Sequence, residues 1–489
     1  MVALPGGEGS GAIDPQTPLG QHTVAGDARR KPGASRDGRP GGSARADGTR
    51  GGLGGSSPRD NTAVDPQRQP LDGVRVADLT RFVAGSQATM WLTALGAEVV
   101  KIEPPPGDPY RTQGTERAGG ESVLFMALNA GKRSLALDFR TSAGREVMDR
   151  LLGRCDMFVE NSRPGSLAAH GLDWESVHER FPGIVYGSIS GYGDIGPDAA
   201  RGGFDLILQA ESGVMSVTGS PQSGPVKVGA PFLDVGAGLS CACGLLAGYI
   251  ERLRTGTGTL VSSSLLEFGL AGLGTILSSV AVSGRETGLL GTHSPLYAPY
   301  GGFRTADGWL VMAGAGSEEL WQRACSALGL TGLTDEPRFA DGASRVAHRD
   351  ELTSCIEAVL TTQPTEHWLG KLEAAGVPAA EVRGLASVLG WPQVAALGSL
   401  QAPAPGASPG TPGAASAAES GAAESGAETD AAAGAFRVVG PPFRLDRTVL
   451  AYPGPAPALG QDTRSVLAEL GYQDAEIARL EGAGVVVAG

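Results

Sequence analysis

Asp234 is the residue whose type and neighbours most clearly suggest chemistry. It lies in the small-residue segment 228–239, VGAPFLDVGAGL, just before a long apolar stretch that predicts a helix. A carboxylate at a helix N-terminus lies in the positive field of the helix dipole, and its usual role there is to cap free backbone N–H groups. The small neighbours also leave room for a bulky ligand. From the residues alone an N-cap is the favoured interpretation, and a reactive carboxylate, ionised at neutral pH without help, is the alternative.

Other chemical motifs in the chain lack the context that they need. Gly191–Gly196 spells G-x-G-x-x-G after a predicted strand, but loop-like residues follow it where a dinucleotide site needs a helix. The G-x-S-x-G of 406–410 lies in a Pro- and Ala-rich stretch rather than a strand–turn–helix. The six His are scattered and the Cys show no metal-ligand spacing, so we expect no metal site. Five Cys do not form a disulfide scaffold, which indicates a cytoplasmic protein.

Composition excludes two broad classes and divides the chain. The net charge of −13 over 489 residues argues against a nucleic-acid binder, and no run approaches the roughly 18 apolar residues that span a membrane. Residues 1–69 lack aromatic side chains and are rich in Gly, so we expect a disordered tail. Residues 401–435 consist almost entirely of Ala, Gly, Ser, Pro and acids, which predicts a low-complexity insertion in a surface loop.

Between these segments, strand and helix patterns alternate. β-branched strands are predicted at 74–79, 98–103, 157–160, 184–189 and 260–262, and helices at 84–95, 145–152, 238–252 and 265–278. This order predicts a large α/β domain with a parallel, Rossmann-like sheet over 70–293. A hairpin at 300–311 with amphipathic helices at 317–327 and 349–361 predicts a smaller α+β domain over 294–390. The remaining residues, 391–489, would return to complete the large domain.

Several separate motifs, in the right order, resemble those of one known family. They are Pro70–Thr80, Leu95–Glu103, Asn129–Ser134, Val159–Gly165, Ser188–Gly193, Arg254–Gly258 and Leu459–Thr463. On these motifs the sequence resembles the family III CoA-transferases, which include formyl-CoA and carnitine CoA-transferases and the α-methylacyl-CoA racemases. The resemblance implies an acyl-CoA:carboxylate CoA-transferase that binds CoA thioesters as substrates and holds no permanent cofactor. It also implies a homodimer of two interlocked chains.

The resemblance assigns roles to particular residues. It implies that Asp234 is the catalytic nucleophile, which would form an aspartyl anhydride and then an aspartyl-CoA thioester. It implies CoA contacts from three segments, which comprise Phe82, Val83 and Ala84; Leu137, Asp138, Phe139 and Arg140; and Asn161, Ser162 and Arg163. Arg140 and Arg163 are the candidates for the CoA diphosphate, because a planar guanidinium suits phosphate.

Two alternatives to a transferase remain open. The racemases of the family use a His and a Glu, but Phe204 and Ala298 stand at the corresponding positions here. Moving a proton at an α-carbon needs a positioned acid and base, and neither residue supplies one, so a racemase or isomerase is disfavoured. A non-catalytic CoA-binding protein is the alternative from another class, and the presence of Asp234 argues against it.

Overall fold

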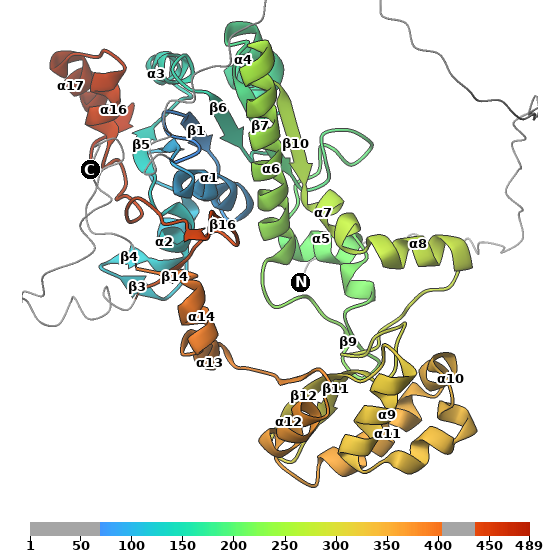
Figure 1. Cartoon of the computed structure of the whole chain (residues 1–489). Helices are drawn as coiled ribbons and strands as arrows, with labels where there is room; N and C mark the ends of the chain where they lie inside the picture. Colours follow the sequence, from blue (N-terminus) through green and yellow to red (C-terminus); the bar gives the residue numbers. More distant parts are fainter. Residues whose placement is uncertain (1–68, 403–435) are drawn as a thin grey trace, which may run out of the picture. The chain divides into compact units, whose positions relative to one another are not determined.

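A computed structural model describes residues 69–402 and 436–489 and shows a mixed α/β architecture (Figure 1). The predicted tail lies outside these ranges except for Gln69, and the predicted insertion lies outside them except for Gln401 and Ala402.

The largest element is a seven-stranded sheet, with the strand order β10-β7-β6-β1-β2-β5-β18. Six strands are parallel, and β18 pairs antiparallel with β5. Their bounds are β1 Arg75–Leu79, β2 Glu98–Glu103, β5 Arg133–Leu137, β6 Met157–Glu160, β7 Val185–Ser190, β10 Leu260–Ser264 and β18 Val486–Val487. The parallel sheet predicted from the alternating patterns is therefore confirmed.

The strand order reverses direction between β1 and β6. From β1 the chain proceeds outward through β2 to β5, and from β6 it proceeds the other way through β7 to β10. In open parallel sheets, ligands bind outside the carboxyl ends of the strands at such a switch point. Two of the predicted CoA-binding segments, Phe82–Ala84 and Asn161–Arg163, directly follow β1 and β6. The topology therefore brings both segments to this point of the sheet.

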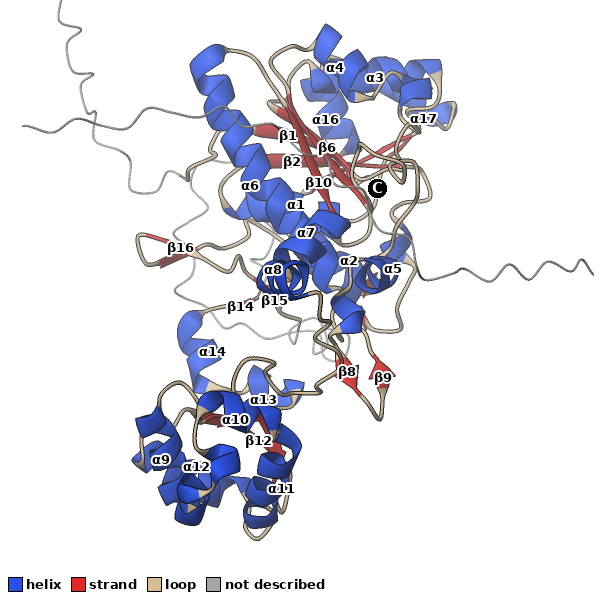
Figure 2. Cartoon of the chain, turned by 90° about the vertical axis from the view of Figure 1, so that its right-hand side faces the viewer, coloured by secondary structure: helices blue, strands red, loops and turns tan. Residues whose placement is uncertain are grey.

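Helices cover both faces of this sheet, so neighbouring residues of one strand face opposite layers (Figure 2). Val76 and Val99 pack with α1 (Ala84–Ala94) and α6 (Phe232–Thr255). Ala77 and Val100 pack with the helices of the other face, which are α3 (Ser142–Leu152), α4 (Trp174–Arg180), α16 (Thr463–Glu469) and α17 (Asp474–Gly482). Burial on both faces explains why apolar residues take successive positions in these strands, as Val99 and Val100 do in β2.

The longest helix, α6, begins earlier than the sequence predicted. It starts at Phe232 instead of residue 238, which places Asp234 inside its first turn. By length and composition alone α6 could cross a membrane, but it packs along α1, α7, β7 and β10, and its inner residues belong to the protein core.

The predicted helix 265–278 is wrong as a single element. It forms α7 (Leu265–Gly272) and α8 (Gly274–Ser283), which meet at a 69° bend. Glycines at 272 and 274 flank this bend, and glycine is a poor helix former in a helix interior.

A second, smaller sheet has its own core. Its antiparallel strands are β11 (Tyr300–Arg304), β12 (Trp309–Ala313) and β13 (Ala379–Glu381), so the predicted hairpin at 300–311 is confirmed. Its helices are α9 (Glu318–Leu328), α10 (Gly342–Ala347), α11 (Arg349–Leu360) and α12 (Thr365–Ala374). Buried Phe303, Trp321, Ile356 and Trp368 are among the side chains that join strands and helices in one cluster.

The segment after the small sheet returns to the large one. Arg133 of β5 forms ion pairs with Asp462 and Glu469, and β18 adds a strand beside β5. Other short helices are α2 (Val123–Asn129), α5 (Asp205–Glu211), α13 (Leu385–Leu389) and α14 (Pro392–Leu397). Two-stranded sheets are formed by β3–β4 (Arg117–Ala118 with Glu121–Ser122), β8–β9 (Gly219–Ser220 with Gly224–Pro225), β14–β15 (Leu400–Gln401 with Val438–Val439) and β16–β17 (Arg444–Leu445 with Thr448–Val449).

Candidate active site

The first turn of α6 holds Asp234 without using its side chain as a cap. Pro231 occupies the N-cap position, and no side chain caps the helix from there. Instead the Asp205 Oδ1 atom of α5 accepts hydrogen bonds from the backbone N–H of Leu233 (2.8 Å) and of Asp234 (3.4 Å). The predicted N-cap role of Asp234 is therefore wrong, because a carboxylate from another helix has taken the free N–H groups.

Gln209 holds Asp205 in place. Its Nε2 atom donates to Asp205 Oδ2 (2.5 Å), and its Oε1 atom accepts from the backbone N–H of Val228 (2.8 Å). Gln209 is fully buried one helical turn after Asp205. This short chain of hydrogen bonds connects α5, the segment before α6 and the turn that carries Asp234. No described residue hydrogen-bonds the side chain of Asp234, so its carboxyl is available for other chemistry.

The electrostatic surroundings of Asp234 shift its acidity. Burial is the main cause and the negative charge of Asp205 the second, and together they raise the pKa of Asp234 to about 7. The sequence predicted a carboxylate that ionises without help. The structure instead gives a carboxyl that is about half protonated at neutral pH.

The segment Phe82–Ala84 lies against the same face of α6 as Asp234. Gly238 is one turn beyond Asp234, and residues four apart share a helix face. A side chain on Gly238 would meet the Ala84 carbonyl oxygen, which lies 2.4 Å from the position of its Cβ atom. Only glycine permits this approach. Phe82 itself has a left-handed backbone, with φ of 60°, which is rare for an aromatic residue.

Asn161 joins the two segments at the switch point. Its side-chain amide donates to the carbonyl of Arg81 (2.7 Å) and accepts from the backbone N–H of Arg81 (2.8 Å). Ser162 donates its backbone N–H to the buried Glu160 (2.7 Å). The exposed Arg163 makes no side-chain hydrogen bond or ion pair within residues 69–402 and 436–489, so its guanidinium is available to an anion. The Nε atom of Arg163 lies 3.4 Å from the position that a Cβ atom would take on Gly202.

The third predicted segment is less available to a ligand. Leu137 is fully buried, so only its backbone could reach a bound molecule. Asp138 accepts two hydrogen bonds from the Arg140 guanidinium, at 2.7 and 2.9 Å, so these two residues satisfy each other. The Phe139 ring packs edge-on against His170, with ring centres 5.5 Å apart. Arg163 therefore fits a role in phosphate binding better than Arg140 does.

Three residues of the site were not predicted from the sequence. Asp205 and Gln209 are polar residues four apart in the otherwise apolar DLILQA of α5, and this spacing could have marked them as a pair. Tyr110 follows β2, and its ring packs edge-on against Phe82 with ring centres 5.5 Å apart. No pattern in the surrounding residues points to Tyr110.

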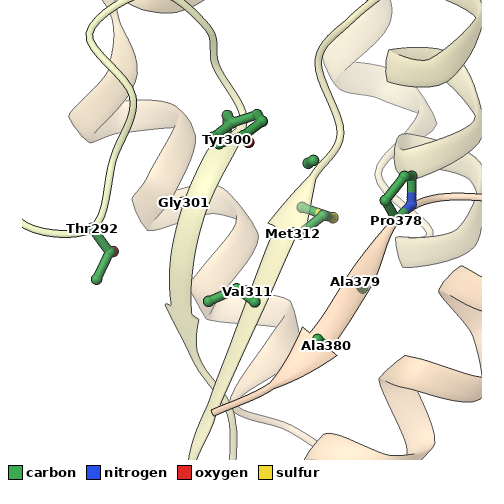
Figure 3. Close-up of a pocket in the computed structure, with 9 residues that line it drawn as sticks. Thr292, Tyr300, Gly301, Val311, Met312, Pro378, Ala379 and Ala380 are labelled. Carbon is green, nitrogen blue, oxygen red and sulfur yellow. The ribbon is translucent and has the colours of Figure 1, made fainter. Parts of the chain in front are cut away.

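Within the two described ranges, no group of three or more His, Cys, Asp and Glu residues could hold a metal ion. A hollow of about 410 Å³ lies on the small sheet and is shown in Figure 3. Its lining is mostly apolar and includes Tyr300, Val311, Met312, Ala379 and Ala380. Tyr300 is its one titratable side chain, so it offers little for catalysis.

The architecture places the chain among α/β proteins with a ligand site at the switch point of a parallel sheet, and comparison with known proteins identifies the family. Residues 71–463 match the CoA-transferase family III, so the chain belongs to this family, and the predicted resemblance is confirmed. It is 34% identical over 420 residues to the human succinyl-CoA:glutarate CoA-transferase, covering 86% of this chain and 90% of the relative.

Other relatives agree with this result. The succinate–glutarate CoA-transferase of Agrobacterium fabrum is 33% identical and is covered over 98% of its length by 84% of this chain. The crystal structure of a CAIB/BAIF family protein from Brucella suis superposes with a TM-score of 0.70 at 31% identity, covering 83% of this chain and all of that one.

Proposed function

We propose that this protein transfers CoA from an acyl-CoA donor to a carboxylic acid, with Asp234 as the covalent nucleophile. The observation that carries the proposal is a partly buried carboxyl with a raised pKa, placed beside Phe82–Ala84 at the switch point of a family III CoA-transferase fold. CoA would lie across the carboxyl ends of β1 and β6, with Arg163 at its phosphates and Asn161 holding the two segments together.

The reaction proceeds in two matched exchanges. The ionised Asp234 attacks the thioester carbonyl carbon, the new C–O bond forms, and the C–S bond breaks, which leaves a mixed anhydride and CoA thiolate. The thiolate then attacks the aspartyl carbonyl, and the donor acid leaves as its carboxylate. The acceptor carboxylate attacks the resulting aspartyl-CoA thioester, and the released thiolate takes the acyl group from the new anhydride. Asp234 is regenerated as a carboxylate.

Racemisation is the second candidate activity, because the family also includes racemases. Phe204 and Ala298 give it no proton donor or acceptor at the positions where its relatives have them. The chain does bring the carboxyls of Asp205 and Asp234 together, but Asp205 is committed to the backbone of α6. We therefore favour transfer over racemisation.

The first substrates to test are succinyl-CoA and glutarate, because the names of two relatives specify this pair. Transfer is measured as glutaryl-CoA by mass spectrometry, and hydroxylamine should trap an Asp234 hydroxamate. Asp234→Asn should abolish both signals, whereas Asp194→Asn, which changes an exposed carboxylate, should retain them. Normal transfer by Asp234→Asn would contradict the assigned nucleophile. Other donors and acids extend the panel if this pair gives no product.

An exposed apolar stripe along α6 supports a homodimer. Val235, Leu239, Ile250 and Leu253 are exposed, Leu253 to 69%, and their spacing places them on one face of this helix. Exposed apolar surface of this kind is typical of a protein–protein interface. We propose that a second copy covers it and that the two chains interlock. If two differently tagged preparations form hybrid dimers within hours under native conditions, the chains are not interlocked.

A further inference from the structure

The start of α6 has no free backbone donor for an acyl oxygen. The N–H groups of Leu233 and Asp234 bind Asp205, that of Phe232 donates to the Ala230 carbonyl (2.8 Å), and that of Val235 donates to the Pro231 carbonyl (3.1 Å). Acyl transfer builds negative charge on the carbonyl oxygen, and enzymes stabilise it with fixed hydrogen-bond donors. A donor for the acyl group at Asp234 must therefore come from another element.

Tyr110 is held rigidly by the residues on either side of it. Its backbone N–H donates to Asp108 Oδ1 (2.9 Å), and the carboxylate of Asp108 forms a buried ion pair with Lys101 at 3.0 Å. Arg111 makes two hydrogen bonds to the buried Glu103, at 2.7 and 2.8 Å. Since both neighbours are anchored in the interior, the backbone of Tyr110 has little freedom to move.

Aromatic contacts connect Tyr110 with the turn that carries Asp234. Its ring packs edge-on against Phe82, and Phe82 packs edge-on against Phe204, with ring centres 6.4 Å apart. Phe204 immediately precedes Asp205, which binds the backbone of Asp234. Phe82, whose backbone is left-handed, contributes the ring that contacts both of the others. The three rings therefore form a row that leads from Tyr110 to α5, whose Asp205 holds the turn that carries Asp234.

The hydroxyl of Tyr110 is suited to donate a hydrogen bond near this turn. Tyr110 is half-buried, and its hydroxyl has no hydrogen-bond partner within residues 69–402 and 436–489. Burial first, and then the negative charges of Asp234 and Asp108, raise the pKa of Tyr110 above its ordinary value. The phenol therefore stays protonated throughout the neutral range. The electrostatic influence of Asp234 on the phenol is consistent with this row of contacts.

We propose that Tyr110 is a second catalytic residue, whose hydroxyl donates a hydrogen bond to the acyl carbonyl oxygen as Asp234 attacks it. This inference rests on the proposed transferase activity. The phenol donates without losing its proton, and the bond strengthens as the carbonyl oxygen gains charge in the tetrahedral transition state. The rings of Phe82 and Phe204 would lie beside the acyl chain.

The test is the single-turnover rate of hydroxylamine-trapped Asp234 formation with succinyl-CoA as the probe. Tyr110→Phe, which removes only the hydroxyl, should lower the saturating rate by about 100-fold, the usual effect of losing one such donor. The half-saturating succinyl-CoA concentration and the melting temperature should stay close to those of the wild type. The matched control is Tyr249→Phe on α6, about 22 Å along the helix from Asp234, which should keep the wild-type rate.

The outcomes separate this inference from the proposed function. If the wild type traps the hydroxamate and Tyr110→Phe does so at the same rate, Tyr110 has no catalytic role and the transferase assignment stands. If the half-saturating concentration rises while the saturating rate is unchanged, Tyr110 only binds substrate, and the inference is again wrong. If the wild type traps nothing with succinyl-CoA, acetyl-CoA or other donors, the nucleophile and the role of Tyr110 are both refuted.

Discussion

Replacing Asp205 by Asn should move the pH dependence of CoA transfer to lower pH. Asp234 must be ionised to attack a thioester, and its pKa of about 7 leaves about half of the carboxyl ionised at pH 7 and about one tenth at pH 6. The acid limb of the rate should therefore have its midpoint near pH 7 in the wild type. Asn keeps a side-chain oxygen that can accept hydrogen bonds from the N–H groups of Leu233 and Asp234, but it removes the negative charge of Asp205.

The structure also limits the size of this change. The pKa of Asp234 rises from 3.8 to about 7, and burial is the larger of the two causes, with the charge of Asp205 the smaller. More than half of the rise should therefore survive in Asp205→Asn, which places the new midpoint between about pH 5.4 and 7. A fall of one pH unit would raise the rate at pH 5.5 about eightfold relative to the plateau of each enzyme.

The assay is the single-turnover trapping rate, measured with saturating succinyl-CoA from pH 5 to 9. Glu211→Gln is the matched control, because it also removes a carboxylate from α5 but one that is exposed and paired with Arg201. Its midpoint should equal that of the wild type. A midpoint in Asp205→Asn that stays at pH 7 or moves higher would refute the argument that Asp205 raises the pKa of Asp234.

Two further predictions concern stability. The raised pKa means that Asp234 adds stability only while it is protonated: the contribution is complete below about pH 4 and is lost as pH rises through about 7. Asp234→Asn should therefore melt at a higher temperature than the wild type at pH 8 but not at pH 4, and equal melting at pH 8 would argue against the buried carboxyl. Lys132→Met should cost about 3–5 kcal/mol in urea unfolding, since it removes the ion-pair partner of buried Asp78, at 2.9 Å, whereas Arg150→Met, which breaks an exposed pair, should leave the urea midpoint close to that of the wild type. A similar loss in the two variants would contradict this.

Local patterns in the sequence were sufficient to predict the elements of the large sheet. The segments 74–79, 98–103 and 157–160 became β1, β2 and β6, and each was recognisable from adjacent apolar residues, which suit a strand buried on both faces. The start of α6 was missed for a tertiary reason. Asp205 lies about 30 positions earlier in the chain, and no local pattern shows that it will take the first N–H groups of this helix.

The site was predicted only in part, and the cause is similar. Motif resemblance pointed to Asp234 and to the segments after β1 and β6, because these are short sequences with fixed spacing. The acidity of Asp234 depends on its burial and on a neighbouring carboxylate, and the position of Tyr110 depends on a buried ion pair between Lys101 and Asp108. Such features arise only when distant segments pack together.

The edge strand β18 has a consequence for how the protein is synthesised. It pairs with β5, yet about 350 residues of chain separate the two strands. Two residues of β5 also bind partners that emerge from the ribosome late: Arg133 forms an ion pair with Glu469, and the backbone N–H of Ser134 donates to Asp462. During translation the β5 edge is therefore open, with unpaired backbone groups of the kind that attract other strands. A nascent chain arrested before residue 460 should depend on chaperones, and release of the full chain should end that dependence.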